Sequence, residues 1–121
     1  MKIFKIEEYV RFENPTPGKL YRPEILTKEH KAQDLGGLFA ILVPGAQVPY
    51  HYHNNRESLF IGISGEGTET IEGREYTIKA GDVLYIPAGE KHGLANRSAK
   101  DFRYLEFYTY PPIEADFVEV E

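Results

Sequence analysis

Four side chains of this sequence have the types and spacing of a metal site: His51, His53, Glu57 and His92. Side chains two positions apart on a strand point to the same face, so a strand over this segment directs both early imidazoles into one space. The carboxylate of Glu57 follows within reach, and His92 can approach from across the sheet. Because the chain has no cysteine, thiolate sites are excluded, and any metal must be held by imidazole and carboxylate.

The residues around these ligands follow two spaced patterns. Gly45 is followed by five residues, His-x-His, three residues and Glu57, and the second pattern runs Gly81, five residues, Pro87-x-Gly89, two residues, His92, three residues, Asn96. These patterns resemble the two motifs of the cupin family, and they cover residues 45–96. The resemblance implies an all-β, single-domain double-stranded β-helix (a jelly-roll barrel). It further implies one divalent transition metal (Mn, Fe, Co, Ni, Cu or Zn), a small-molecule ligand or substrate, and a homodimer.

The spacing after Glu57 departs from the family. Seven residues lie between Glu57 and Gly65, where the family has six, so counting back from Gly65 puts Ser58 at the ligand position. Adjacent strand residues point to opposite faces, so only one of the two can enter the barrel. An inward Glu57 brings Leu59, Ile61 and Ile63 inside; an inward Ser58 brings Phe60, Gly62 and Ser64. We favour Glu57 as fourth ligand, with a bulge near residues 62–65, and keep a three-histidine site as the alternative.

The rest of the chain predicts the frame. Residues 1–36 form an N-terminal segment of the same domain, with strands over Ile3–Ile6 and Arg22–Leu26 and a helical turn within Thr27–Asp34; residues 37–110 form the barrel, and residues 111–121 form a C-terminal tail that is an edge strand or a loose end. Within the barrel, short runs between turn residues predict eight strands. They are Gly37–Val43, Gln47–His53, Glu57–Ser64, Gly67–Ile71, Arg74–Lys79, Asp82–Pro87, His92–Asn96 and Phe102–Tyr110. Both faces of the last strand carry apolar residues, so both should be covered.

Composition narrows the partners. The 121 residues fit one domain, and the net charge of −5 without a basic stripe argues against a nucleic-acid partner. No apolar run approaches the length of a membrane span. The N-terminus carries Glu7 and Glu8 and lacks the apolar core of a signal peptide. We therefore expect a cytoplasmic protein with no membrane partner.

Two functions stay open. One is a metal-dependent dioxygenase, decarboxylase or isomerase, and the other is a non-catalytic barrel that binds or senses a small molecule. Both would share the same motifs, and the sequence names no catalytic residue beyond the metal ligands. Arg56 either attracts an anionic ligand or is a loop charge.

Overall fold

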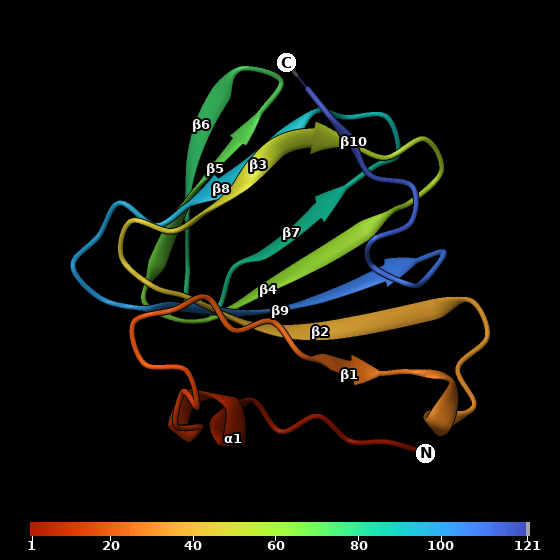
Figure 1. Cartoon of the computed structure of the whole chain (residues 1–121), viewed down its shortest axis with the longest axis horizontal. Helices are drawn as coiled ribbons and strands as arrows, with labels where there is room; N and C mark the ends of the chain where they lie inside the picture. Colours follow the sequence, from red (N-terminus) through yellow and green to blue (C-terminus); the bar gives the residue numbers. More distant parts are fainter. Residues whose placement is uncertain (121) are drawn as a thin grey trace.

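In the computed structural model, which describes residues 1–120, two five-stranded antiparallel sheets face each other (Figure 1). The first sheet has, in spatial order, β1 (Glu24–Leu26), β2 (Leu35–Leu42), β9 (Phe102–Thr109), β4 (Ser58–Ser64) and β7 (Val83–Ile86). The second has β10 (Val118–Glu119), β3 (Gln47–Tyr52), β8 (His92–Ala95), β5 (Glu66–Ile71) and β6 (Arg74–Lys79). The predicted all-β double-stranded β-helix is confirmed. Glu121, the end of the predicted tail, lies outside the described residues.

One end of the space between the sheets is filled by apolar side chains. The register of β2 and β9 places Leu42 opposite Phe102 at this end and Gly36 opposite Tyr108 at the other. Phe102 and Leu42 belong to a buried cluster with Ile78 and Leu94. This cluster holds the two sheets together, and Phe60, Leu94 and Tyr104, which belong to it, also line a cavity between the sheets.

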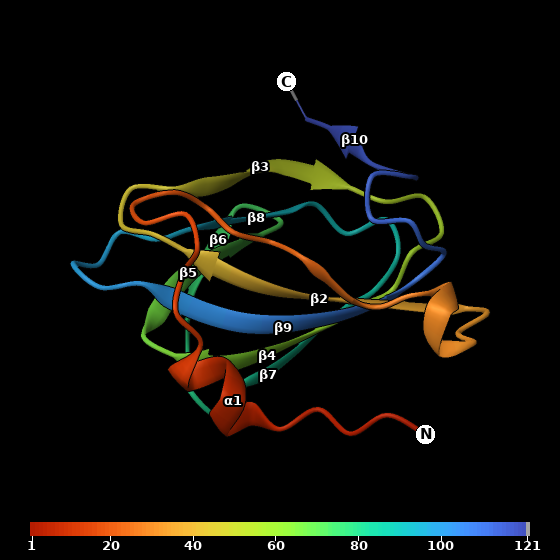
Figure 2. The same ribbon diagram turned by 60° about the horizontal axis from the view of Figure 1, so that its bottom comes forward.

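A second cluster lies on the outer face of the first sheet, around Phe39, Ile41 and Leu105. The N-terminal segment covers it, with the ring of Tyr9 centred 4.9 Å from that of Phe39, and Figure 2 shows this segment running along the outside of β2 and β9. Both faces of β9 are therefore covered, as its sequence predicts.

The predicted strand over Ile3–Ile6 is wrong. Residues 1–5 are irregular, and an α-helix, α1 (Ile6–Arg11), follows. Glu7 and Glu8 lie in its first turn and Arg11 in its last, and Glu7 pairs with Arg11 at 2.9 Å, an i, i+4 arrangement that stabilises short helices. The expected helical turn within Thr27–Asp34 is present as a 3-10 helix, η1 (Lys28–His30).

Neither helix of the described chain has the length and apolar character needed to cross a membrane. The predicted N-terminal strand over Arg22–Leu26 is present in shorter form as β1. Val118–Glu119 of the predicted tail pairs with β3, so this part of the chain is an edge strand.

Candidate metal centre

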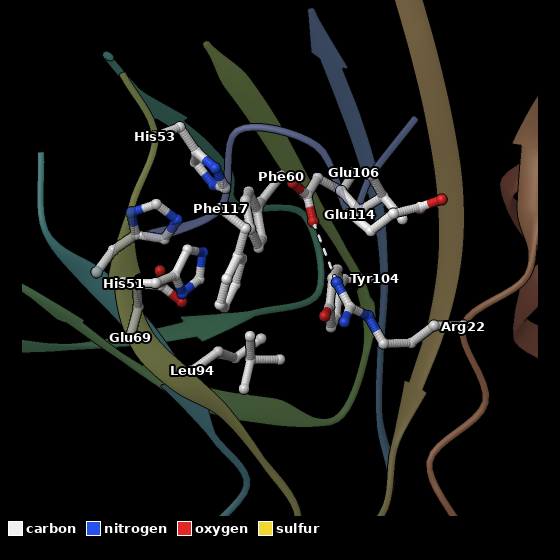
Figure 3. A pocket seen from close by; sticks show the side chains of 13 residues that line it. Arg22, His51, His53, Phe60, Glu69, Leu94, Tyr104, Glu106, Glu114 and Phe117 are labelled. Atoms are coloured by element: carbon white, nitrogen blue, oxygen red, sulfur yellow. Dashed lines mark ion pairs between the residues drawn. The ribbon is translucent and has the colours of Figure 1, made fainter. Parts of the chain in front are cut away.

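Three imidazoles meet inside the open end of the barrel. His51 on β3 pairs with His92 on β8 across the ladder, and His53 follows β3 directly. All three side chains are buried, and each offers a ring nitrogen within 4.8 Å of the others'. The histidine spacing of the sequence therefore brings these three rings together as predicted (Figure 3).

Each imidazole is oriented by a backbone carbonyl. The Nδ1 atoms of His51, His53 and His92 lie 2.5, 2.7 and 2.9 Å from the carbonyl oxygens of Pro49, Asp116 and Glu90. A carbonyl oxygen can only accept a hydrogen bond, so each Nδ1 carries the proton and donates it. The lone pair of each ring is then on Nε2, the atom left to bind a metal.

Burial also keeps these rings neutral. Desolvation lowers the pKa of His51 to about 3 and lowers the pKa values of His53 and His92 below the usual histidine value. At neutral pH all three rings are therefore unprotonated on Nε2. Neutral imidazole is the form that binds transition metals, so the donor set fits a divalent ion.

Glu57 lies away from the three rings. Its side chain is exposed, and its Oε1 accepts a hydrogen bond of 2.5 Å from the Tyr85 hydroxyl. Ser58 is buried instead, Phe60 lines the cavity and Leu59 is 43% exposed. The expectation that Glu57 and Leu59 face inward is therefore wrong, and the structure does not bring Glu57 to the imidazoles.

Packing and close approach explain which face of β4 enters. The Phe60 ring stacks on Tyr104 with centroids 5.4 Å apart. A Cβ on Gly62 would lie 2.2 Å from the backbone oxygen of Lys79, so this position has to be glycine where the chain passes Lys79. The expected bulge is confirmed, because the register of β4 and β9 shifts between Gly62 and Ser64. It absorbs a residue after the inward-facing segment.

The cavity beside the imidazoles has a volume of about 320 Å³. Apolar side chains form much of its wall, and five polar side chains line it besides the histidines. The apolar residues are Val48, Phe60, Leu94, Ile113 and Phe117, and the five polar residues are Arg22, Glu69, Tyr104, Glu106 and Glu114. Tyr104 and Glu106 come from β9, Glu69 from β5, and Arg22 from the segment before β1 (Figure 3).

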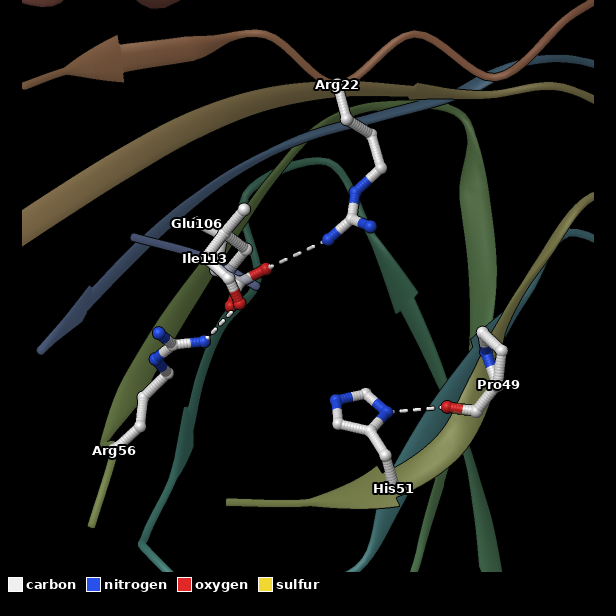
Figure 4. Close-up of polar contacts among 6 residues, drawn as sticks. All are labelled: Arg22, Pro49, His51, Arg56, Glu106 and Ile113. Carbon is white, nitrogen blue, oxygen red and sulfur yellow. Dashed lines mark hydrogen bonds and ion pairs between the residues drawn. The ribbon is translucent and has the colours of Figure 1, made fainter. Parts of the chain in front are cut away.

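Burial dominates the electrostatics of these polar groups. It raises the pKa of Glu69 to about 9, with a further contribution from Glu106. It also raises the pKa of Glu106, against the opposing effect of Arg22. Arg22 Nη2 lies 3.9 Å from Glu106 Oε1, a long ion pair rather than a hydrogen bond (Figure 4).

Several of these buried atoms have no hydrogen-bond partner among residues 1–120. They include both carboxyl oxygens of Glu69, the hydroxyl of Tyr104 and Nε of Arg22, together with the hydroxyls of Ser58 and Tyr108. Buried polar atoms in proteins nearly always find a partner. Four of these atoms, on Arg22, Glu69 and Tyr104, belong to residues that line the cavity beside the imidazoles, which marks it as a place for a polar ligand.

The C-terminal segment completes the centre by crossing the open end of the barrel (Figure 2). Asp116 supplies the carbonyl that binds His53, and its carboxylate accepts the backbone N–H groups of Asn54, Asn55 and Arg56. The ring of Phe117 stacks on His51 at a centroid distance of 4.2 Å. This segment thus orients one imidazole and covers another.

Arg56 fastens that segment. Its guanidinium is buried and donates hydrogen bonds to the carbonyls of Thr109, Tyr110, Pro112 and Ile113, at distances of 2.7 to 3.0 Å. Figure 4 shows the bond to Ile113. The sequence left Arg56 as an anion-attracting residue or a loop charge. It is neither, because all three nitrogens are bonded to backbone.

Sequence reasoning missed four groups of the site: Arg22, Glu69, Glu106 and Asp116. Alternation on β9 already placed Glu106 on the same face as Phe102, Tyr104 and Tyr108. A carboxyl group on an aromatic strand face could therefore have indicated a site residue. Arg22 and Asp116 had none, because they reach the site from segments far away in the sequence.

Comparison with known proteins agrees with this geometry. A family model described as "Cupin domain" matches residues 38–108, more than half of the chain. The oxalate-binding protein of Thermotoga maritima is 32% identical over 90 residues, 73% of this chain and 74% of that protein.

Solved structures agree as well. A double-stranded β-helix protein from Klebsiella pneumoniae, uncharacterised, superposes with a TM-score of 0.76 at 27% identity, over 100% of this chain and 98% of its own. A predicted oxalate decarboxylase from Thermotoga maritima gives a TM-score of 0.71 at 27% identity, over 78% of this chain and 83% of its own. The two sheets, the matched motifs and these similarities together show that this chain belongs to the cupin family.

Proposed function

We propose that this protein binds one divalent transition metal through Nε2 of His51, His53 and His92, and a small carboxylate in the adjoining cavity. The observation that carries the proposal is the carbonyl partner on every Nδ1, since it leaves a lone pair on Nε2 of three rings that each offer a nitrogen within 4.8 Å of the others'. A bound metal would supply a Lewis acid that accepts oxygen ligands from the small molecule.

Charge supports a carboxylate as the metal-binding end of that molecule. Three neutral imidazoles leave the charge of a divalent ion uncompensated, and the positive Arg22 is paired with Glu106. A site with net positive charge attracts an anion. The names of two similar proteins, oxalate-binding protein and predicted oxalate decarboxylase, point to the same chemical class.

A second candidate function is catalysis at this site, as a dioxygenase, decarboxylase or isomerase. Glu69 favours it, because burial raises the pKa of its carboxyl to about 9 and so keeps a proton donor in the metal cavity at neutral pH. Binding and catalysis are separated by incubating metal-loaded protein with oxalate and short hydroxy acids while following oxygen uptake and carbon dioxide release. Turnover above that of metal-free protein selects the enzyme.

Metal content tests the shared part of both candidates. Purified protein reloaded with Mn, Fe, Co, Ni, Cu or Zn and then dialysed should retain about one ion per chain for at least one metal. His51→Ala, His53→Ala and His92→Ala should each lose most of it. His30→Ala is the matched control, because this exposed histidine caps η1 far from the cavity. Equal metal retention in all four variants would refute the ligand assignment.

The cytoplasmic location and the homodimer remain predictions. Light scattering of the purified chain measures the second directly, and a mass of one chain in solution would contradict it.

A further inference from the structure

The unpartnered polar groups of the cavity come from separate elements yet face one space. Glu69 is on β5 of the second sheet, Tyr104 is on β9 of the first, and Arg22 precedes β1. Glu69 and Tyr104 are each 1% exposed. Both Glu69 oxygens, the Tyr104 hydroxyl and Arg22 Nε have no hydrogen-bond partner within the described chain.

Stability alone does not account for such an arrangement. A buried polar group without a partner destabilises the fold, and an apolar side chain of similar size would remove the penalty. Proteins retain such groups where they serve a site. The partner of these atoms is therefore expected to be a molecule that enters the cavity.

The polar groups select against a second carboxylate at this end. Glu69, Glu106 and Glu114 all face the cavity, and its one guanidinium is already paired with Glu106. A second carboxylate would therefore meet three carboxyl groups and no unpaired cation. A hydroxyl group fits better, because it donates to a carboxyl oxygen and accepts from a guanidinium N–H or a phenol O–H. The hydroxyl groups along one chain can form hydrogen bonds with Arg22, Glu69 and Tyr104.

The size of the cavity leaves room for such a chain. Its volume of about 320 Å³ corresponds to roughly ten water molecules at about 30 Å³ each. A two-carbon acid held at the metal would leave much of that space, and the unpartnered atoms in it, without contact.

We propose that Arg22, Glu69 and Tyr104 form a hydroxyl-recognising subsite, and that the natural ligand is a short polyhydroxy monocarboxylic acid. This proposal rests on the proposed function, because the carboxylate of the acid is taken to bind the metal. The remaining hydroxyls of the acid bind the subsite. Phe60, Leu94 and Ile113 pack against its carbon chain.

The test is calorimetric titration of Mn(II)-loaded protein with three acids. Glycolate carries only the metal-binding end, threonate adds two hydroxyl carbons, and malate has the chain length of threonate with a carboxylate at the far end. We expect threonate to bind at least tenfold more tightly than glycolate, and malate to gain nothing over glycolate. Equal affinities for glycolate and threonate, or malate binding as tightly as threonate, would overturn the subsite.

Two variants locate the effect. Tyr104→Phe and Glu69→Leu should each weaken threonate binding by roughly two- to tenfold, the effect of losing a hydrogen bond, and leave glycolate affinity and metal content within twofold of wild type. Both should unfold at the same temperature as wild type or higher, since each removes an unpartnered buried group. A change that weakens both acids equally would mean a structural role and would contradict the proposal.

The outcomes distinguish a failure of the hydroxyl subsite from a failure of the proposed function. Protein that retains metal and binds glycolate, but shows no gain for threonate, overturns the subsite and leaves the proposed function standing. Protein that binds no acid in a metal-dependent way overturns both.

Discussion

Two arginines show how differently one residue type is used in this barrel. Arg56 is 1% exposed, and its guanidinium binds four backbone carbonyls at 2.7 to 3.0 Å. Arg22 has a buried Nε without a partner among the described residues, and its nearest carboxylate oxygen is 3.9 Å away on Glu106. The first guanidinium is saturated and holds structure together, whereas the second keeps donor capacity for a ligand.

The difference sets what each region of the site does. Arg56 fixes the C-terminal segment, whose Asp116 carbonyl orients His53 and whose Phe117 covers His51. The geometry of the metal centre therefore depends on it indirectly. Arg22 lies at the cavity wall, and its ion pair is with Glu106 rather than with the C-terminal segment, so its main effect should fall on the small molecule.

Arg56 should give the largest effect. Arg56→Ala leaves four carbonyls without their donor and should lower the free energy of unfolding by about 3 kcal/mol or more, because each buried acceptor that loses its partner costs about 1–3 kcal/mol. Urea unfolding measures this, and metal affinity should fall with it. Arg56→Lys keeps the charge without the planar fork and should recover only part of the loss. A loss below about 1 kcal/mol in Arg56→Ala would show that the segment is held by other contacts.

Asp116 comes next, through pH. Hydrogen bonds from the backbone N–H of Asn55, and then from Asn54 and Arg56, hold the pKa of its carboxyl below the usual value of 3.8. A carboxyl with a depressed folded-state pKa stabilises the fold above its unfolded-state pKa, and this stabilisation is lost as pH falls through the folded value. Asp116→Asn should thus be less stable than wild type at pH 7, with a difference that shrinks below pH 4. Thermal melts of the two metal-free proteins at several pH values measure this difference. A difference that persists unchanged at pH 3 would disprove the stabilising role of the Asp116 carboxylate.

Arg22 should affect the ligand and spare the metal. Arg22→Gln should retain metal at wild-type stoichiometry and weaken threonate binding by roughly two- to tenfold, measured by titration of the Mn(II)-loaded protein. Arg22→Lys, which retains the charge, should be closer to wild type. Loss of bound metal in Arg22→Gln would show that the two arginine regions are not separate.

Glu57 should give the smallest effect. Its exposed carboxylate binds the Tyr85 hydroxyl on the outer surface, so Glu57→Ala should keep its metal and change the unfolding free energy by no more than about 0.5 kcal/mol. Elemental analysis after dialysis is sufficient here. Metal loss in this variant would restore the four-ligand hypothesis.

These contrasts also mark what the sequence could predict. Strand alternation and motif spacing placed His51, His53 and His92 correctly, because both depend on local geometry. The same reasoning offered Glu57 and Ser58 as alternatives, and the wrong one was favoured because apolar lining was weighed without the close approach of Gly62 to Lys79.

Long-range contacts limit how much of the site can be predicted from the sequence. Arg22 and Asp116 reach the site only after the whole chain has folded, and the hydrogen bond from His53 to Asp116 spans 63 positions. No periodicity along the chain encodes such a contact. Glu106 differs, because strand alternation predicts which face of β9 it lies on. That this face lines a cavity could be known only from the folded structure.

The most direct test is a crystal structure of the protein loaded with Zn(II), with the ion located by its anomalous scattering. We expect one ion at about 2.0–2.1 Å from Nε2 of His51, His53 and His92, with all three Nδ1 atoms still bonded to their carbonyls. An ion bound through Nδ1, or held by Glu57 in place of one of these rings, would contradict the account.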